Sequence, residues 1–121
     1  MILATINQPK QLLHLSFIGH VRAEELAHSR EDLPALLASL SPGFKLVTDL
    51  GRLDSIDADC VTEIGQAMEL CGQKGVGLVI RVIPDPTKDI GLNIISQFHY
   101  ANRPRVVTCN SIVEAAKFLS L

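Results

Sequence analysis

Residues 44–72 read FKLVTDLGRLDSIDADCVTEIGQAMELCG, and the other patterns of the chain extend outward from this unit. An apolar strand is predicted over 44–50, an acidic turn over 51–58 and a helix over 59–72. The helix has one apolar stripe, formed by Val61, Ile64, Met68 and Cys71. A strand that passes through a polar turn into a helix is the repeating unit of α/β proteins.

Strand and helix patterns alternate on both sides of this unit. The further predicted strands are residues 2–6, 11–18, 76–83 and 103–109. The further predicted helices are residues 22–40, 87–98 and 112–119. Gly19 and His20 should close an antiparallel hairpin of the first two strands, and Pro34 should kink or restart the first helix. Ser111 and Glu114 form a capping-box pattern that opens the last helix, which should pack through Val113, Ala116 and Leu119 or a neighbouring stripe.

These elements predict an α/β fold. Strands joined through helices favour parallel neighbours with right-handed crossovers, whereas the hairpin adds an antiparallel edge. We therefore expect one domain over residues 1–121, with a mixed, mainly parallel sheet of four to five strands and about four helices.

Composition narrows the classes of function. The chain has 121 residues, of which 47% are apolar and 20% charged, with a net charge of −2. This slightly acidic balance argues against nucleic-acid binding, which favours a basic surface. No apolar run reaches the ~20 residues that span a bilayer, and no signal peptide is expected. Three cysteines are an odd number for a disulfide framework, so we expect reduced thiols and a cytoplasmic protein.

The predicted turn and the helix after it contain a group of carboxylates: Asp49, Asp54, Asp57, Asp59 and Glu63. This turn should lie at the carboxyl ends of the strands, where open α/β sheets bind ligands. Three interpretations remain open. Asp59 is a helix N-cap, the turn binds a partner protein, or the carboxylates hold Mg²⁺ or Ca²⁺.

Other chemistry has little support. The four histidines, His14, His20, His28 and His99, lack the spacing of a zinc site. Cys60, in the first turn of a helix, is either a reactive thiol or a small buried apolar residue. Nucleophile-elbow and phosphate-loop motifs are absent, so we expect no enzyme activity, no metal and no cofactor.

The stretch from residue 17 to residue 119 resembles the STAS domain, the family of bacterial anti-sigma-factor antagonists, stressosome proteins and anion-transporter tails. Residues 44–60 are similar to the family's strand and its turn of Asp-Ser/Thr-Ser/Thr-Gly type. Residues 72–80 (GQKGVGLVI) and 110–119 (NSIVEAAKFL) are similar to its next glycine-to-strand step and its closing helix.

The resemblance implies a regulatory module that binds a protein, with its surface at the turn. Asp57 matches the family's turn Asp, whereas Ala58 and Asp59 replace the two hydroxyl residues and Cys60 replaces the Gly. The second hydroxyl is the phosphoacceptor in the sigma-factor regulators, so Asp59 either mimics a phosphorylated state or belongs to a relative that does not switch.

We therefore expect a non-enzymatic interaction module that lacks the phosphorylatable Ser/Thr. Its partner-binding residues are Asp57, Ala58, Asp59 and Cys60. The resemblance implies a kinase-like anti-sigma factor as partner, and a homodimer stays open. The alternative is a small-molecule or lipid carrier, in which the sheet and residues 84–98 enclose an apolar ligand.

Overall fold

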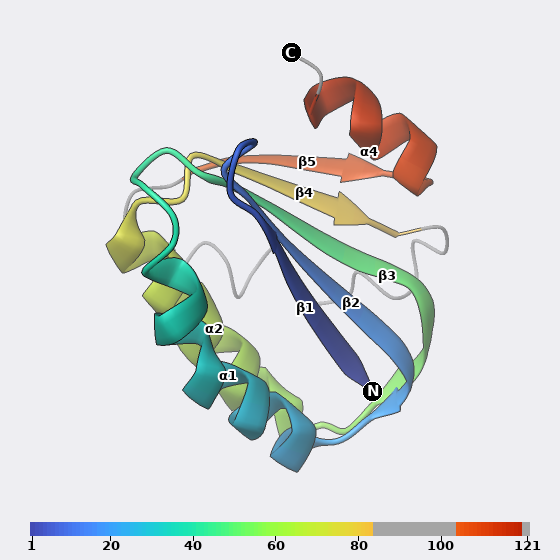
Figure 1. The fold of residues 1–121 in the computed structure, drawn as a ribbon. Coiled ribbons are helices and arrows are strands. Elements are labelled where there is room, and N and C mark those ends of the chain that lie inside the picture. Colours follow the sequence, from blue (N-terminus) through green and yellow to red (C-terminus); the bar gives the residue numbers. More distant parts are fainter. Residues whose placement is uncertain (84–103, 120–121) are drawn as a thin grey trace.

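The computed structural model describes residues 1–83 and 104–119 (Figure 1). The described strands are β1 (Ile2–Asn7), β2 (Leu12–Val21), β3 (Lys45–Ile56), β4 (Leu78–Val82) and β5 (Arg105–Cys109). The described helices are α1 (Ala23–Leu37), α2 (Cys60–Lys74) and α4 (Ile112–Leu119). The predicted helix over residues 87–98 lies outside the described residues.

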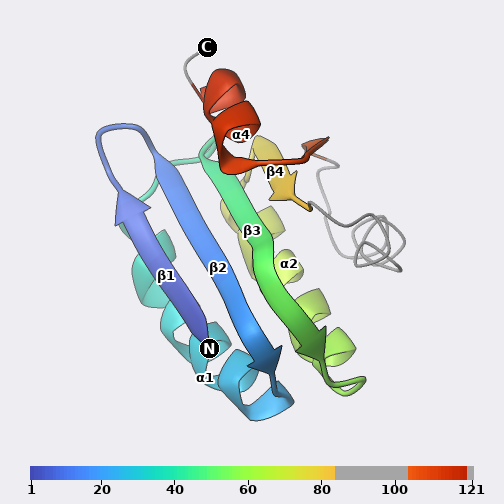
Figure 2. The same ribbon diagram turned by 90° about the vertical axis from the view of Figure 1, so that its right-hand side faces the viewer.

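The strands form one mixed sheet in the order β1-β2-β3-β4-β5. β1 and β2 are antiparallel, which confirms the predicted hairpin, and the pairs from β2 to β5 are parallel. Figure 2 shows β2 and β3 running side by side to the same edge of the sheet. An α/β fold with a mixed, mainly parallel sheet is therefore confirmed.

Helices lie on both faces of this sheet (Figures 1 and 2). α1 and α2 cover one face, and the buried residues there form two apolar clusters, one containing Phe44 and the other Leu50. α4 covers the β4–β5 end of the other face, above Val47 and Ile80. β4 therefore has helices on both faces, and this explains why its sequence is apolar except at Arg81.

Two boundaries differ from the sequence prediction. β2 continues through the predicted turn at Gly19 and His20, and β3 continues through most of the predicted acidic turn. The two strands keep pairing to Val21 and Ile56, with register shifts that absorb the irregular spacing. Because each strand supplies the hydrogen-bonding partner of the other, polar residues remain in the extended conformation there. The turn shrinks to residues 57–59.

The helices also refine the prediction. α1 contains Pro34 as a single helix, with no second helix starting there. α4 has the predicted bounds, and its Glu114 amide donates to Ser111 Oγ at 3.2 Å. The Glu114 carboxylate accepts from the Asn110 amide at 3.0 Å instead of the expected Ser111 amide. α4 packs through the neighbouring stripe, formed by Ala115, Phe118 and Leu119.

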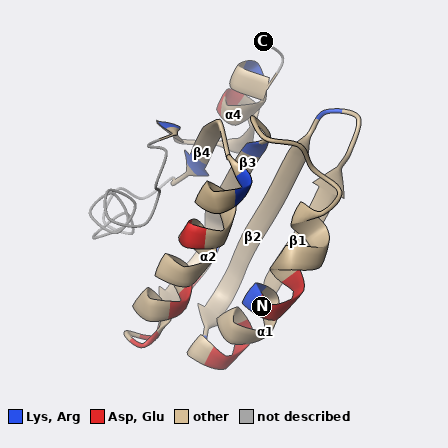
Figure 3. Cartoon of the chain, turned by 90° about the vertical axis from the view of Figure 1, so that its left-hand side faces the viewer, with Lys and Arg blue, Asp and Glu red and all other residues tan. Residues whose placement is uncertain are grey.

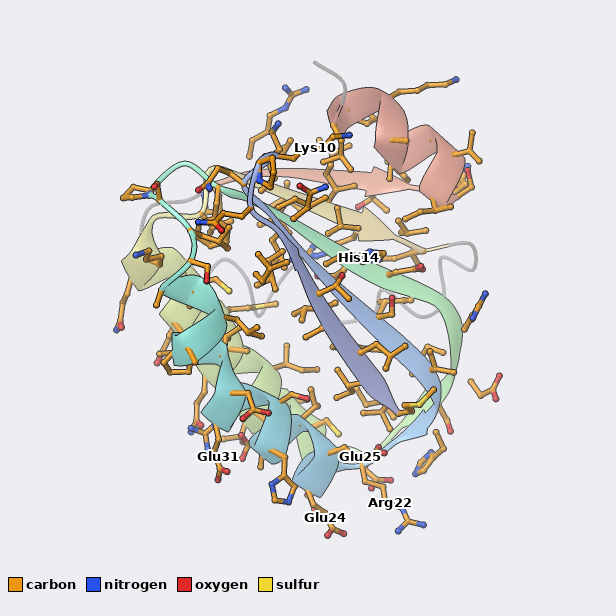
Figure 4. All side chains as sticks on the ribbon, in the orientation of Figure 1. Lys10, His14, Arg22, Glu24, Glu25 and Glu31 are labelled. Atoms are coloured by element: carbon orange, nitrogen blue, oxygen red, sulfur yellow. The ribbon has the colours of Figure 1, made fainter. Side chains whose placement is uncertain are left out.

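α1 and α2 begin at the same end of the molecule, and that end is acidic (Figure 3). Glu24 and Glu25 lie in the first turn of α1, and Glu63 lies in the first turn of α2. Figure 4 shows Glu24, Arg22 and Glu25 gathered at the start of α1. The Glu25 carboxylate accepts from the Arg22 amide at 2.9 Å, and this bond is the largest cause of the lowered pKa of Glu25. Acidic groups at helix N-termini complement the helix dipoles.

Candidate functional site

The turn formed by residues 57–59 connects the carboxyl end of β3 to the start of α2. The end of β2 lies beside it, because the Asp57 amide donates to the Val21 carbonyl at 3.1 Å. The turn therefore has the expected position at the carboxyl edge of the sheet, next to the start of α1.

His20 holds Asp57 in place. His20 Nε2 lies 2.9 Å from Asp57 Oδ1, and His20 Nδ1 is hydrogen-bonded to Ser55 Oγ. The side chains of His20 and Asp57 are each nearly half exposed, at 48% and 44%. One imidazole thus links the end of β2 to the end of β3 and to the turn, and it orients the Asp57 carboxylate on the surface. Sequence reasoning missed this pairing because residues 20 and 57 come together only through the β2–β3 register.

Ala58 and Asp59 are exposed at the tip of the turn. Asp59 precedes α2, as the N-cap interpretation requires, but its side chain makes no capping hydrogen bond. Its backbone is helical, with φ −65° and ψ −14°, whereas a capping residue normally has an extended backbone that aims its oxygen at the free amides. The predicted capping hydrogen bond of Asp59 is therefore absent, and its carboxylate is exposed to solvent.

Cys60 lies beneath the turn. Its side chain is only 1% exposed, and its thiol donates to the Val21 carbonyl at 3.7 Å. Desolvation raises the pKa of the thiol and outweighs the hydrogen bond from the backbone that lowers it. The interpretation as a buried apolar residue is confirmed over the reactive thiol. Cys60 therefore anchors the turn, and the expectation that its side chain forms part of a contact surface is corrected.

Two apolar side chains flank the turn on the surface. Ile56 is 37% exposed, and Val61 is 53% exposed. The predicted stripe of the helix is confirmed at Met68 and Cys71, which are buried. It is wrong at Val61, because the helix buries Cys60 at its start instead. A helical stripe identifies the spacing of buried residues, but the start of the stripe depends on how the helix sits on the sheet. The surface around residues 56–61 is thus acidic and apolar together.

The carboxylates of the predicted acidic group do not converge. The Asp49 carboxylate accepts from the Gly51 amide at 2.9 Å, whereas Glu63 pairs with Arg30 of α1 at 2.7 Å. Asp57 is paired with His20, and Asp54 is exposed on β3. Within residues 1–83 and 104–119, no three His, Cys, Asp or Glu side chains are placed to hold a metal ion. The interpretation as a cation site has no support from the described residues.

A cavity of about 80 Å³ lies between the sheet and the α1–α2 pair. Most of its described lining is aliphatic and comes from β1, β2, β3, α1 and α2. Its polar lining residues are Ser29, Arg30, Thr48 and Arg81. Arg81 is 2% exposed and lies directly across from Thr48 in the β3–β4 register. The carrier pocket expected from the sequence involved residues 84–98, which lie outside the described residues, so this cavity was not predicted. A charged residue inside the apolar run 76–83 was the available signal.

Comparisons with solved structures identify the fold. An uncharacterized protein of the DUF3478 family with a SpoIIAA-like fold, from Shewanella loihica, matches 98% of this chain and 92% of its own chain, with 15% identity and a TM-score of 0.73. The anti-sigma factor antagonist SpoIIAA in its unphosphorylated form matches 99% and 98%, with 15% identity and a TM-score of 0.65. An anti-sigma factor antagonist from Mycobacterium paratuberculosis matches 100% and 94%, with 15% identity and a TM-score of 0.62.

The chain therefore has the SpoIIAA-like fold, a STAS-like α/β domain, as the resemblance of its sequence to that family implies. No protein-family model and no curated protein matches its sequence. Among the described helices, none combines the length and the apolar character needed to cross a bilayer.

Proposed function

We propose that this protein is a non-enzymatic regulatory module that binds a partner protein through the surface of residues 56–61. The observation that supports this most directly is the exposure of Ala58, Asp59 and Val61 around an Asp57 that His20 holds in place. A fixed acidic turn with exposed apolar neighbours fits a partner that offers cationic and apolar side chains. The likeness of fold to anti-sigma factor antagonists supports a kinase-like anti-sigma factor as that partner.

Asp59 gives this surface a carboxylate at the position that matches the phosphoacceptor of the sigma-factor regulators in the STAS family. Asp59 is exposed and makes no capping bond, so its charge is available to a partner. A carboxylate carries about half the charge of a phosphoserine and fewer acceptor oxygens. Asp59 therefore gives the turn a permanent negative charge that no kinase has to add.

A binding assay tests this proposal. The tagged chain and its Asp59→Ser variant are titrated against the purified kinase-like anti-sigma factors of the source organism. We expect Asp59→Ser to change the affinity by about tenfold, the usual effect of one charged contact. Asp32→Ser, at an exposed position of α1, is the matched control and should leave the affinity unchanged. Equal affinity of the wild type and Asp59→Ser for a partner that binds would overturn the role of the turn. Size-exclusion chromatography is run on the chain alone and on its mixture with the anti-sigma factor. A homodimer elutes at twice the mass of the chain without the partner, whereas a complex with the partner appears only in the mixture.

The cavity between the sheet and the α1–α2 pair favours a second candidate function, a small-molecule carrier. Native mass spectrometry of freshly purified protein tests it. A retained ligand supports the carrier, and a mass equal to that of the bare chain under conditions that preserve weak complexes argues against it.

A further inference from the structure

β1 is an edge strand that lacks the usual protection against pairing. It stands first in the strand order and lies at one side of the described sheet (Figure 2). Its sequence, Ile2–Asn7, contains no charged residue and no proline, and its pairing with β2 has no register shift. Sheet edges are usually protected by charges, proline or a bulge, because an open edge pairs readily with another strand. β1 is therefore able to accept a further strand.

The pairing with β2 determines which backbone groups of β1 point outward. The Met1 amino group donates to the Ile18 carbonyl, and the Ile18 amide donates to the Met1 carbonyl, both at 2.8 Å. Along an antiparallel pair, such doubly bonded residues alternate with residues that make no bond to the partner strand. The amides and carbonyls that point out of the sheet edge therefore belong to Ile2, Ala4 and Ile6.

These outward groups are complementary to a second copy of the same strand. When two β1 strands run antiparallel about a two-fold axis at Ala4, each Ala4 faces the other, and Ile2 faces Ile6 of the second copy. All three pairs can then exchange two hydrogen bonds each. The side chains of these residues share one face of the sheet, so isoleucine meets isoleucine across the junction. No like charges oppose one another along the paired strands.

The charges at the two ends of β1 also favour an antiparallel second copy. β1 starts near the acidic first turn of α1, which contains Glu24 and Glu25, and the Met1 amino group lies 3.3 Å from the Glu25 carboxylate. Lys10 lies in the turn at the other end of β1 (Figure 4). The second copy would bring its Lys10 toward this acidic end, and the reverse holds on the other side of the two-fold axis. Opposite charges therefore approach at both ends of the junction.

We propose that two copies of this chain join through their β1 edges and form a homodimer with one continuous sheet. This inference goes beyond the proposed function, because it concerns a different surface. The turn of residues 57–59 follows β3, which β2 separates from β1. The dimer therefore presents two copies of that turn, each open to a partner.

The mass in solution tests the dimer. Size-exclusion chromatography with light scattering is run on the full chain at about 100 μM, above the dissociation constant of a micromolar dimer. We expect twice the mass of the chain. Leu3→Lys, at a half-exposed position of β1, places two like charges beside the two-fold axis and should weaken the dimer about tenfold. Val113→Lys, at an exposed apolar position of α4, is the matched control and should leave the dimer unchanged.

A second variant removes a backbone donor from the edge. Ala4→Pro should abolish the dimer and preserve the β1–β2 pairing, because the Ala4 amide points away from β2. Circular dichroism checks that this variant is folded, and Leu3→Lys keeps the proposal testable if it is not.

Cross-linking tests the register. The two Ala4 Cα atoms should lie about 5.5 Å apart, within the range of about 4.4–6.8 Å that a disulfide spans. Under mild oxidation, Ala4→Cys should therefore give a covalent dimer on a non-reducing gel. Asn7→Cys is the matched control and should not, since its two copies would lie about 20 Å apart. The three native cysteines are buried and should not compete.

Several results would overturn the proposal. A wild-type chain that is monomeric at about 100 μM would exclude the dimer. A dimer that both Leu3→Lys and folded Ala4→Pro leave unchanged would exclude β1 as its surface. Equal cross-linking of Ala4→Cys and Asn7→Cys would exclude the register. A chain that is monomeric by itself and captures a strand of another protein through β1 would exclude a second copy as the occupant.

Discussion

At the scale of single residues, Asp59 stands at the start of α2 without acting as its cap. The backbone of Asp59 is helical, and its carboxylate makes no hydrogen bond to the free amides of the first turn. The remaining stabilising term is the interaction of its negative charge with the positive end of the helix. This leaves Asp59 free for recognition, at little cost to the helix.

Asp59→Ala should therefore lower the free energy of unfolding by less than about 1 kcal/mol, the size of an exposed helix-dipole interaction. Loss of a true capping bond costs up to about 2 kcal/mol. Urea denaturation measures the difference, with Asp32→Ala in α1 as the control for removing an exposed carboxylate. A loss near 2 kcal/mol in Asp59→Ala alone would mean that the side chain caps the helix in solution.

The buried thiols make stability depend on alkaline pH. Burial raises the pKa of Cys71 from 9.0 to about 12 and raises those of Cys60 and Cys109 in the same direction. Because the folded pKa lies above the unfolded pKa, the folded chain holds the thiol proton more tightly. The stability that each buried thiol adds is fully present below the pKa of the unfolded chain. It is lost as the pH rises through the pKa of the folded chain.

We therefore expect the free energy of unfolding to fall by up to about 1.4 kcal/mol per pH unit above about pH 9 through Cys71, with contributions of the same sign from Cys60 and Cys109. Urea denaturation between about pH 8 and pH 11 measures this slope. In Cys71→Ala the slope should become shallower, since the two other thiols still contribute. An unchanged slope in that variant would contradict the assignment to Cys71.

At the scale of elements, α2 ends at a glycine that its surroundings require. Gly75 has φ 97°, in the left-handed region, and its amide donates to the carbonyls of Cys71 and Gly72. A Cβ atom at this position would lie 3.1 Å from Pro42 Cβ in the loop after α1. The end of α2 is thus closed by backbone conformation and pressed against that loop.

Gly75→Ala should cost about 1–2 kcal/mol for the left-handed backbone, plus the displacement of Pro42. Gly43→Ala is the matched control, because Gly43 has φ 91° with no atom within 4 Å of a new Cβ. Thermal and urea unfolding should show a larger loss for Gly75→Ala than for Gly43→Ala. Equal losses would show that the Pro42 contact relaxes without cost.

Some helices and strands could be predicted from the local sequence pattern, and others could not. The hairpin, α2, β4 and α4 were predicted close to their observed positions, because each has its own apolar period. The ends of β2 and β3 were not, because residues 51–56 have a polar, turn-like sequence that becomes a strand by pairing with β2. The length of a strand depends on the neighbouring strand with which it pairs, which is distant in the sequence. The spacing of apolar residues within one strand does not reveal that pairing.

At the scale of the whole molecule, α4 covers the β4–β5 end of the second face of the sheet. Ala115, Phe118 and Leu119 pack on Val47, Ile80, Val82 and Cys109. Val113 points away from this contact and is 70% exposed. Among the described residues, α4 supplies the apolar side chains that cover this part of the face.

A chain that ends at residue 111 should therefore lose several kcal/mol of stability, since each large apolar side chain is worth about 1.5–3 kcal/mol when buried. It should also bind the dye ANS, because exposed apolar sheet takes up such dyes. Urea denaturation and ANS fluorescence check both expectations. Val113→Ala is the control and should shift stability by no more than about 0.5 kcal/mol. Unchanged stability of the shortened chain would mean that α4 is only loosely attached.

For the protein as a whole, the α/β alternation and the acidic turn with Asp57, Ala58 and Asp59 could be predicted from the sequence. Both depend on the period of apolar residues and on local turn chemistry, which neighbouring residues set. The STAS-like fold was implied by the resemblance of residues 17–119 to that family. Three other features required the folded chain: His20 contacts Asp57, Cys60 and not Val61 is buried, and Arg81 and Thr48 line one cavity. Those contacts join residues far apart in the chain, and they arise from strand register and from the way each helix sits on the sheet.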